Sequence, residues 1–139
     1  MATWNKINDF VEQSWLGLHD MNTDQIKLYL TNVAPVATNT VFGTPAEIAA
    51  GNGYTTKGED TLNVMTENPA GTAEVVAQDI TWTATGGAIA QFRYVVAFNE
   101  TLASPLDGLV GWYDHGSAVD LATGESFTVD FGANWLTFV

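Results

Sequence analysis

The feature that most constrains this chain is a succession of short runs rich in Thr, Val and aromatic residues, separated by turn-forming residues. Threonine, valine and aromatic side chains favour extended backbone, whereas Gly, Pro, Asn and Asp favour turns. Runs that return about every ten residues are typical of all-β sandwiches and barrels. We therefore expect strands at residues 61–66, 72–77, 79–85, 88–99, 109–116, 126–131 and 134–139.

A further strand and a helix are expected before these runs. Residues 26–31 alternate between aliphatic side chains and a lysine, a tyrosine and a threonine, which predicts a half-buried strand. Between residues 5 and 19 the apolar side chains recur at spacings of three and four, which predicts an amphipathic helix. That apolar stripe consists of Ile7, Phe10, Val11, Trp15 and Leu18. The hydrophobic period thus changes near residue 24.

The strand at residues 26–31 is followed by a long connection that extends to about residue 60. Thr44, Pro45 and Glu47 fit the start of a helix, as cap, first helical residue and capping-box partner. Gly51 and Gly53 would end that helix after one turn, because glycine tolerates positive φ. The segment is either a simple connection or, as long ordered loops often are, a source of contacts with a partner.

These elements predict a mainly β fold in one domain. A hydrophobic fraction of 46% allows a packed core, and a chain with no cysteine must hold together without disulfides. We expect a single antiparallel β-sandwich of jelly-roll or immunoglobulin-like kind over residues 1–139, with a helical segment at 1–23 and strands at 24–139. The sequence has neither a long apolar run nor a signal-peptide start, so we expect a soluble protein made in the cytoplasm.

The charge is strongly one-sided. Sixteen acidic residues against four basic ones give a formal net charge of -12, and the basic residues are scattered along the chain. Nucleic acids are bound by clustered Lys and Arg, and anionic membranes attract basic segments. We therefore expect no nucleic-acid partner and no membrane partner. An acidic surface suits either plain solubility or contact with a basic patch on another protein.

The stretch Asp114–Ser117 contains the three residue types of a hydrolase triad, Asp114, His115 and Ser117. A triad needs nucleophile, base and acid within hydrogen-bond reach of one another. Adjacent strand residues point to opposite faces, so Asp114 cannot orient His115 in a regular strand. The nucleophile-elbow pattern G-x-S-x-G is absent as well. We predict no catalytic residues, with a carboxylate pair for glycoside cleavage as the remaining enzymatic alternative.

Cofactor and metal sites are not expected either. The chain lacks a calcium loop, a phosphate-binding loop and a dinucleotide fingerprint, and two histidines without cysteine make a poor zinc site. Arg93 lies inside an apolar run, where an unpaired charge would be expensive to bury. We expect Arg93 to pair with Asp114 on the neighbouring strand, with Asp130 as second candidate.

Four stretches of the chain together resemble a family of small structural proteins encoded by tailed bacteriophages. They are IKLYLTNVAPVATNTV at 26–41, EIAAGNGYTT at 47–56, TWTATGGAIAQFRYVVAFNET at 81–101, and PLDGLVGWYDHGSAVDLATGESFTVDF at 105–131. The resemblance runs from about residue 5 to the C-terminus. It implies a component of the virus particle and leaves its position on the particle open.

Within that setting we expect a capsid decoration (cement) protein on the outer surface of the head. Its partners would be the major capsid protein and neighbouring copies of itself, as a homo-oligomer on the particle. A tail-tube or other tail component is the alternative, and a particle-associated glycan hydrolase is a third reading. Apolar and aromatic side chains anchor interfaces, so we expect the partner interface at Trp4, Phe10, Trp15, Val41, Phe42 and Tyr54. We also expect deletion of residues 1–19 to weaken binding to heads more than it harms the sandwich.

Overall fold

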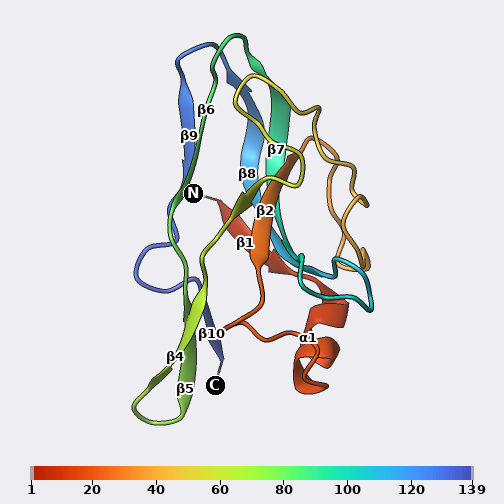
Figure 1. The fold of residues 1–139 in the computed structure, drawn as a ribbon, viewed down its shortest axis with the longest axis vertical. Helices are drawn as coiled ribbons and strands as arrows, with labels where there is room; N and C mark the ends of the chain where they lie inside the picture. The colour runs from red at the N-terminus through yellow and green to blue at the C-terminus, as the bar shows by residue number, and fades with distance from the viewer. Residues whose placement is uncertain (1, 139) are drawn as a thin grey trace.

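The computed structural model describes residues 2–138, which form ten strands and one short helix (Figure 1). All strand pairs are antiparallel and are distributed over sheets of five, three and two strands. The expected mainly β, antiparallel fold is therefore confirmed. The two smaller sheets lie on one side of the five-stranded sheet, on the left in Figure 1.

The five-stranded sheet is built around one long hairpin. In spatial order it contains β1 (Thr3–Lys6), β8 (Leu109–Leu121), β7 (Ile89–Asn99), β2 (Ile26–Thr31) and β3 (Glu59–Asp60). The helix α1 (Asn8–Trp15) follows the edge strand β1 directly. The N-terminal segment is thus attached to the sheet at its β8 edge.

The second layer consists of paired antiparallel strands, and the strand pairing is broken at one place along it. Strands β5 (Thr72–Val76) and β6 (Ile80–Thr83) follow each other in the chain, and so do β9 (Ser126–Val129) and β10 (Leu136–Phe138). β6 pairs with β9 and β5 pairs with β10, while β4 (Val64–Asn68) adds a third strand beside β5. The interruption divides this layer into two small sheets.

The core lies between the two layers and is rich in aromatic side chains. Trp82 and Phe92 are almost fully buried, and the ring centroid of Phe127 is 5.0 Å from that of Phe92. At the other end of the layer, Trp4 of β1 packs against Tyr113 and Trp135, with ring centroids 4.8 and 5.7 Å apart. These contacts join β1 to both layers.

The long connection at residues 32–58 covers the other face of the five-stranded sheet, on the right in Figure 1. Phe42 packs on Tyr29 and Phe98, with ring centroids 5.0 and 4.8 Å apart, and the Tyr29 hydroxyl donates a hydrogen bond of 2.9 Å to the Pro45 carbonyl. Apart from the half-buried Lys27, every residue of β2 is buried. The expectation of a half-buried β2 is wrong, because the connection covers its second face.

The single-turn helix expected at residues 44–47 is also wrong. The Glu47 carboxylate does not cap a helix but accepts hydrogen bonds from the Lys57 backbone N–H, at 3.1 and 3.2 Å, and from the Tyr54 hydroxyl at 3.2 Å. The Lys57 ammonium in turn binds Asp107 at 2.9 Å and Glu100 at 3.1 Å. Glu47 therefore ties together two parts of the connection.

The predicted and observed ends of helices and strands differ most at the N-terminus. Residues 3–6 form β1 along β8, so the helix spans Asn8–Trp15 and not residues 5–19. The strand expected at 61–66 begins at Val64, and β8 continues past the expected end to Leu121. The remaining strands lie within a few residues of their predicted places. Val139, predicted in the last strand, lies outside the described residues.

Candidate functional site

The Asp114–Ser117 stretch lies at an irregularity of β8. In the β7–β8 ladder Phe92 pairs with Val119 and Tyr94 with Asp114, so β8 carries extra residues between its two pairs. Gly116 adopts a φ of 93° at this bulge, a conformation that glycine reaches without a steric penalty. The Gly116 N–H donates a hydrogen bond of 2.8 Å to the Asp114 carboxylate. The bulge thus turns residues 115–118 away from regular pairing.

Asp114 is held by Arg93 and does not orient His115. The Arg93 Nε donates to Asp114 Oδ1 at 2.8 Å, and Nη2 donates to Oδ2 at 3.0 Å, a bidentate geometry. The hydrogen bonds from Arg93 lower the pKa of Asp114. Asp130, the other candidate partner, accepts a hydrogen bond from the Gly132 N–H at 2.7 Å. Arg93 is 38% exposed, so this pair lies at the surface and contributes little to stability.

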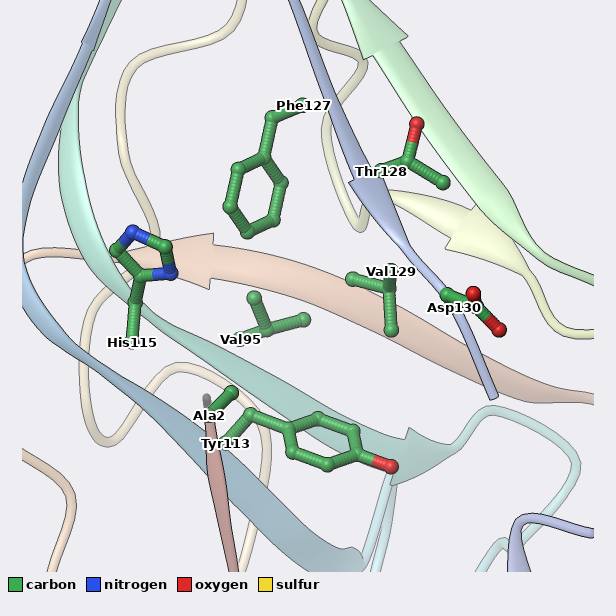
Figure 2. Close-up of a pocket in the computed structure, with 8 residues that line it drawn as sticks. All are labelled: Ala2, Val95, Tyr113, His115, Phe127, Thr128, Val129 and Asp130. Carbon is green, nitrogen blue, oxygen red and sulfur yellow. The ribbon is translucent and has the colours of Figure 1, made fainter. Parts of the chain in front are cut away.

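A small cavity of about 250 Å³ opens next to His115 (Figure 2). The imidazole faces the Phe127 ring, with centroids 5.5 Å apart, and Tyr113 and Val95 lie on the same side. Burial raises the pKa of Tyr113 to about 12, so its hydroxyl stays protonated at neutral pH. Ser117 is exposed and does not line the cavity. The residues that the sequence places side by side do not converge as a triad.

A larger hollow is an open groove of about 780 Å³ between α1 and the sheet of β10, β5 and β4. In Figure 1 these elements face each other at the bottom of the molecule. The aromatic side chains that line the groove are Trp4, Phe10, Trp15, Trp135 and Phe138, and its aliphatic and thioether side chains include Val11, Met21, Met65 and Leu136. The groove is therefore predominantly apolar.

The helix α1 leaves much of its apolar surface uncovered along this groove. Ile7, just before the helix, is fully buried and Phe10 is 6% exposed, because both point into the core. Trp15 in contrast is 89% exposed, and Val11, which also lines the groove, is 40% exposed. A tryptophan exposed to this degree beside an apolar groove is characteristic of a surface that contacts another molecule.

His19 is buried beneath the groove and joins α1 to the sheet. Its Nε2 lies 3.0 Å from the Gln13 Oε1 of α1, and its Nδ1 lies 3.1 Å from the Asn99 Nδ2 of β7. The Asn99 amide also donates to the Asp24 carboxylate at 2.6 Å. Burial lowers the pKa of His19, and the negative charge of Asp24 partly opposes this effect.

The six predicted interface residues fall into three groups. Trp4, Phe10 and Trp15 all line the groove, but Phe10 is buried and Trp4 is half-buried, so Trp15 is the most exposed of the three. Val41 and Phe42 belong to the long connection and are half-buried. Tyr54 is 2% exposed, and its hydroxyl accepts a hydrogen bond from the Leu30 N–H. Phe10 and Tyr54 are buried within the subunit, and their interface role stays a prediction.

Sequence reasoning missed the far wall of the groove and its floor. Met65, Leu136 and Phe138 come from β4 and β10, and His19 comes from the turn after the helix. The alternation of Leu136 and Phe138 signals a strand with one apolar face, but it does not reveal that β10 faces α1 at the other end of the chain.

Electrostatically, the basic side chains are largely paired within the subunit. Lys27 binds Glu100 at 3.2 Å, Lys57 binds Glu100 and Asp107, and Arg93 binds Asp114. Lys6 lines the groove and is exposed. The surface presented to a partner is thus dominated by carboxylates.

Comparisons with known proteins found no relative: no family model, no curated protein and no solved structure matches this chain.

Within residues 2–138, no group of three or more His, Cys, Asp or Glu side chains is arranged to hold a metal ion. The helix is too short to cross a membrane, and it is the only helix in the described part of the chain.

Proposed function

We propose that this protein is a structural component of a tailed-phage particle that attaches to the outside of the head as a decoration protein. The observation that carries the proposal is the solvent-open aromatic groove beside Trp15, on a domain of net charge -12. An apolar patch with a polar surround is typical of a protein–protein contact. The phage setting comes from the resemblance of residues 26–41, 47–56, 81–101 and 105–131 to small virion proteins.

The charge favours the outer side of the shell. A strongly acidic protein on the inner surface would meet packaged DNA at close range, within the Debye length of about 8 Å where like charges repel. The outer surface carries no such penalty. There the groove would contact the major capsid protein, and neighbouring copies could bridge adjacent capsomers.

The test is to add the purified protein to phage heads that lack it. We expect co-sedimentation with the heads and greater resistance of the loaded heads to heat. An unrelated acidic protein of similar size is the control for non-specific adsorption. Because no reaction is involved, the Ser117→Ala and His115→Ala variants should bind as the unaltered chain does.

Two outcomes would contradict the head assignment. If the protein ignores heads but assembles into rings or binds isolated tails, it is a tail component, the alternative that an acidic, DNA-repelling lumen would suit. If it cleaves host-surface glycans, or shows a hydrolytic activity that Ser117→Ala abolishes, it is an enzyme.

A further inference from the structure

We propose that the groove between α1 and the β10–β5–β4 sheet receives a segment of the partner protein that carries large apolar side chains flanked by Lys or Arg. The identity of that partner as a capsid protein rests on the proposed function. The chemistry of the groove does not, and it can be tested separately.

One row of side chains on the sheet wall of the groove is apolar across all three strands. Met65 is in register with Val75, and Val75 with Leu136, so these three side chains form a row on one face of the sheet. Ala73 and Phe138 are in register in the next row. Val75 is fully buried, whereas Met65, Ala73, Leu136 and Phe138 are only half-buried. An inserted apolar side chain would complete their burial.

The helix wall supplies the exposed aromatic contact. Trp15 is 89% exposed and Val11 is 40% exposed, and both line the groove from α1. They are four residues apart, so they lie on neighbouring turns of one helix face. Large apolar side chains of a partner can therefore pack between this face and the sheet.

Acidic side chains stand at the edges of both walls. Glu67 is in register with Ala73, which places it on the groove face of the sheet at the edge strand β4, where it is exposed. Glu12 is exposed on α1, three residues before Trp15 and therefore next to it on the helix surface. Basic side chains on either side of an apolar anchor would meet these two carboxylates.

The charges argue for a foreign partner and against a second copy. Lys27, Lys57 and Arg93 are all engaged by carboxylates of their own subunit. A second copy would therefore bring a net charge of -12 against the same charge, with almost no free cations to offset it. Lys6, which also lines the groove, is the exception, and it would meet a carbonyl or a carboxylate of the bound segment.

The experiment uses the full chain and short fluorescein-labelled peptides with two phenylalanines between pairs of lysines. Binding is followed by fluorescence anisotropy. A peptide with glutamates in place of the lysines, and one with serines in place of the phenylalanines, test the charge and the apolar anchor separately. We expect both substituted peptides to bind more weakly, by at least about tenfold.

Matched variants of the protein locate the site. Trp15→Ala should weaken peptide binding by at least about tenfold, as loss of an interface tryptophan commonly does. Leu106→Ala removes another exposed apolar side chain, 67% exposed and outside the groove, and should have no effect. Glu12→Gln with Glu67→Gln should weaken binding at low salt and flatten its salt dependence, whereas Glu59→Gln, an exposed acid on β3, should not.

The inference is wrong if Trp15→Ala and Leu106→Ala bind the peptide equally, or if the glutamate-flanked peptide binds as tightly as the lysine-flanked one. It is also wrong if the protein forms dimers in sedimentation experiments and Trp15→Ala abolishes them, because the occupant is then a second copy. Head binding that persists in the Trp15 and Glu12/Glu67 variants would overturn the groove assignment and leave the proposed function intact. If the protein binds the peptide but not the heads, the groove assignment stands and the proposed function is wrong.

Discussion

At the scale of single residues, the protonation state of His19 is fixed by the backbone. The Asn99 Oδ1 accepts hydrogen bonds from the N–H groups of Thr101 and Leu102, at 3.0 and 3.2 Å, so the amide nitrogen must face His19. The His19 Nδ1 is then an acceptor, and Nε2 carries the proton and donates it to Gln13. A second proton, on Nδ1, would place the Nδ1–H donor directly opposite the Asn99 Nδ2–H donor in a buried site.

We therefore expect acidification to destabilise the protein through His19. The folded-state pKa of His19 lies below its ordinary value of 6.5, so the unfolded state binds more protons. The contribution of His19 to the free energy of unfolding is fully present above the pKa that His19 has in the unfolded chain. It is lost as the pH falls from there toward the lower pKa of His19 in the folded protein. Urea unfolding between about pH 8 and pH 5.5 should show this loss, since most carboxylates remain ionised over that range.

The control for this prediction is the other histidine. His19→Gln should flatten the pH dependence over that range, whereas His115→Gln, at an exposed position, should leave it unchanged. An equal slope in His19→Gln and in the unaltered chain would contradict the assignment.

Among the site residues, what the sequence could predict depends on how far apart the partners lie. Arg93 and Asp114 belong to neighbouring strands of one hairpin, which suggested the ion pair that the structure contains, although Asp114 is in register with Tyr94 and not with Arg93. His19 is 80 residues from Asn99, and no local pattern relates them. The same limit applies to Trp4 and Trp135, which touch although they lie near opposite ends of the chain.

At the scale of elements, alternation and turn residues predicted most strands because both signals are local. The apolar spacing of residues 5–19 predicts a longer helix than the structure contains. Residues 3–6 gain hydrogen bonds from β8 instead, and Ile7 has an extended backbone with φ of -81° and ψ of 140°. The spacing of apolar residues along the chain carries no information on the pairing of β1 with β8, so it could not show where the helix begins.

The long connection is held close to β2 at Gly58, which leads to a prediction. Gly58 has a φ of 64°, and a Cβ there would overlap the Leu28 carbonyl of β2. Gly132 has the same φ of 64° with open space around it. Gly132→Ala should cost about 1–2 kcal/mol of unfolding free energy from backbone strain alone. Gly58→Ala should cost about 1–3 kcal/mol more, because the connection must also move away from the strand.

Chemical denaturation of the two variants measures this difference directly. Near-equal unfolding free energies for Gly58→Ala and Gly132→Ala would mean that the connection is not packed against β2. The burial of β2 on both faces would then need another explanation.

At the scale of the whole molecule, the groove exists because two ends of the chain meet without closing on each other. α1 follows the first strand and β10 is the last, and Trp4 and Trp135 join these regions at one edge of the groove. Beyond that contact Trp15 stays exposed, since α1 is only eight residues long and packs mainly through Phe10. The fold class followed from local patterns, but this juxtaposition is a property of topology and was not visible in the sequence.

The same topology makes the N-terminal segment part of the folded domain, which bears on the expectation that deleting residues 1–19 weakens head binding more than it harms the sandwich. β1 pairs with β8 over four positions, Ile7 is fully buried, and His19 is 7% exposed. Losing two large buried side chains, Ile7 and Phe10, costs about 2–5 kcal/mol each. That approaches the whole stability of a typical domain, about 5–15 kcal/mol.

We therefore predict that a chain without residues 1–19 melts far below the full-length protein or does not fold, as measured by circular dichroism. Trp15→Ser is the matched control: it alters the same segment at a side chain that is 89% exposed, so its melting temperature should stay close to that of the unaltered chain. A truncated chain that melted at the full-length temperature would show that β1 and Ile7 contribute little. If it melts early, loss of head binding after truncation says nothing about attachment, and only point substitutions such as Trp15→Ser separate binding from folding.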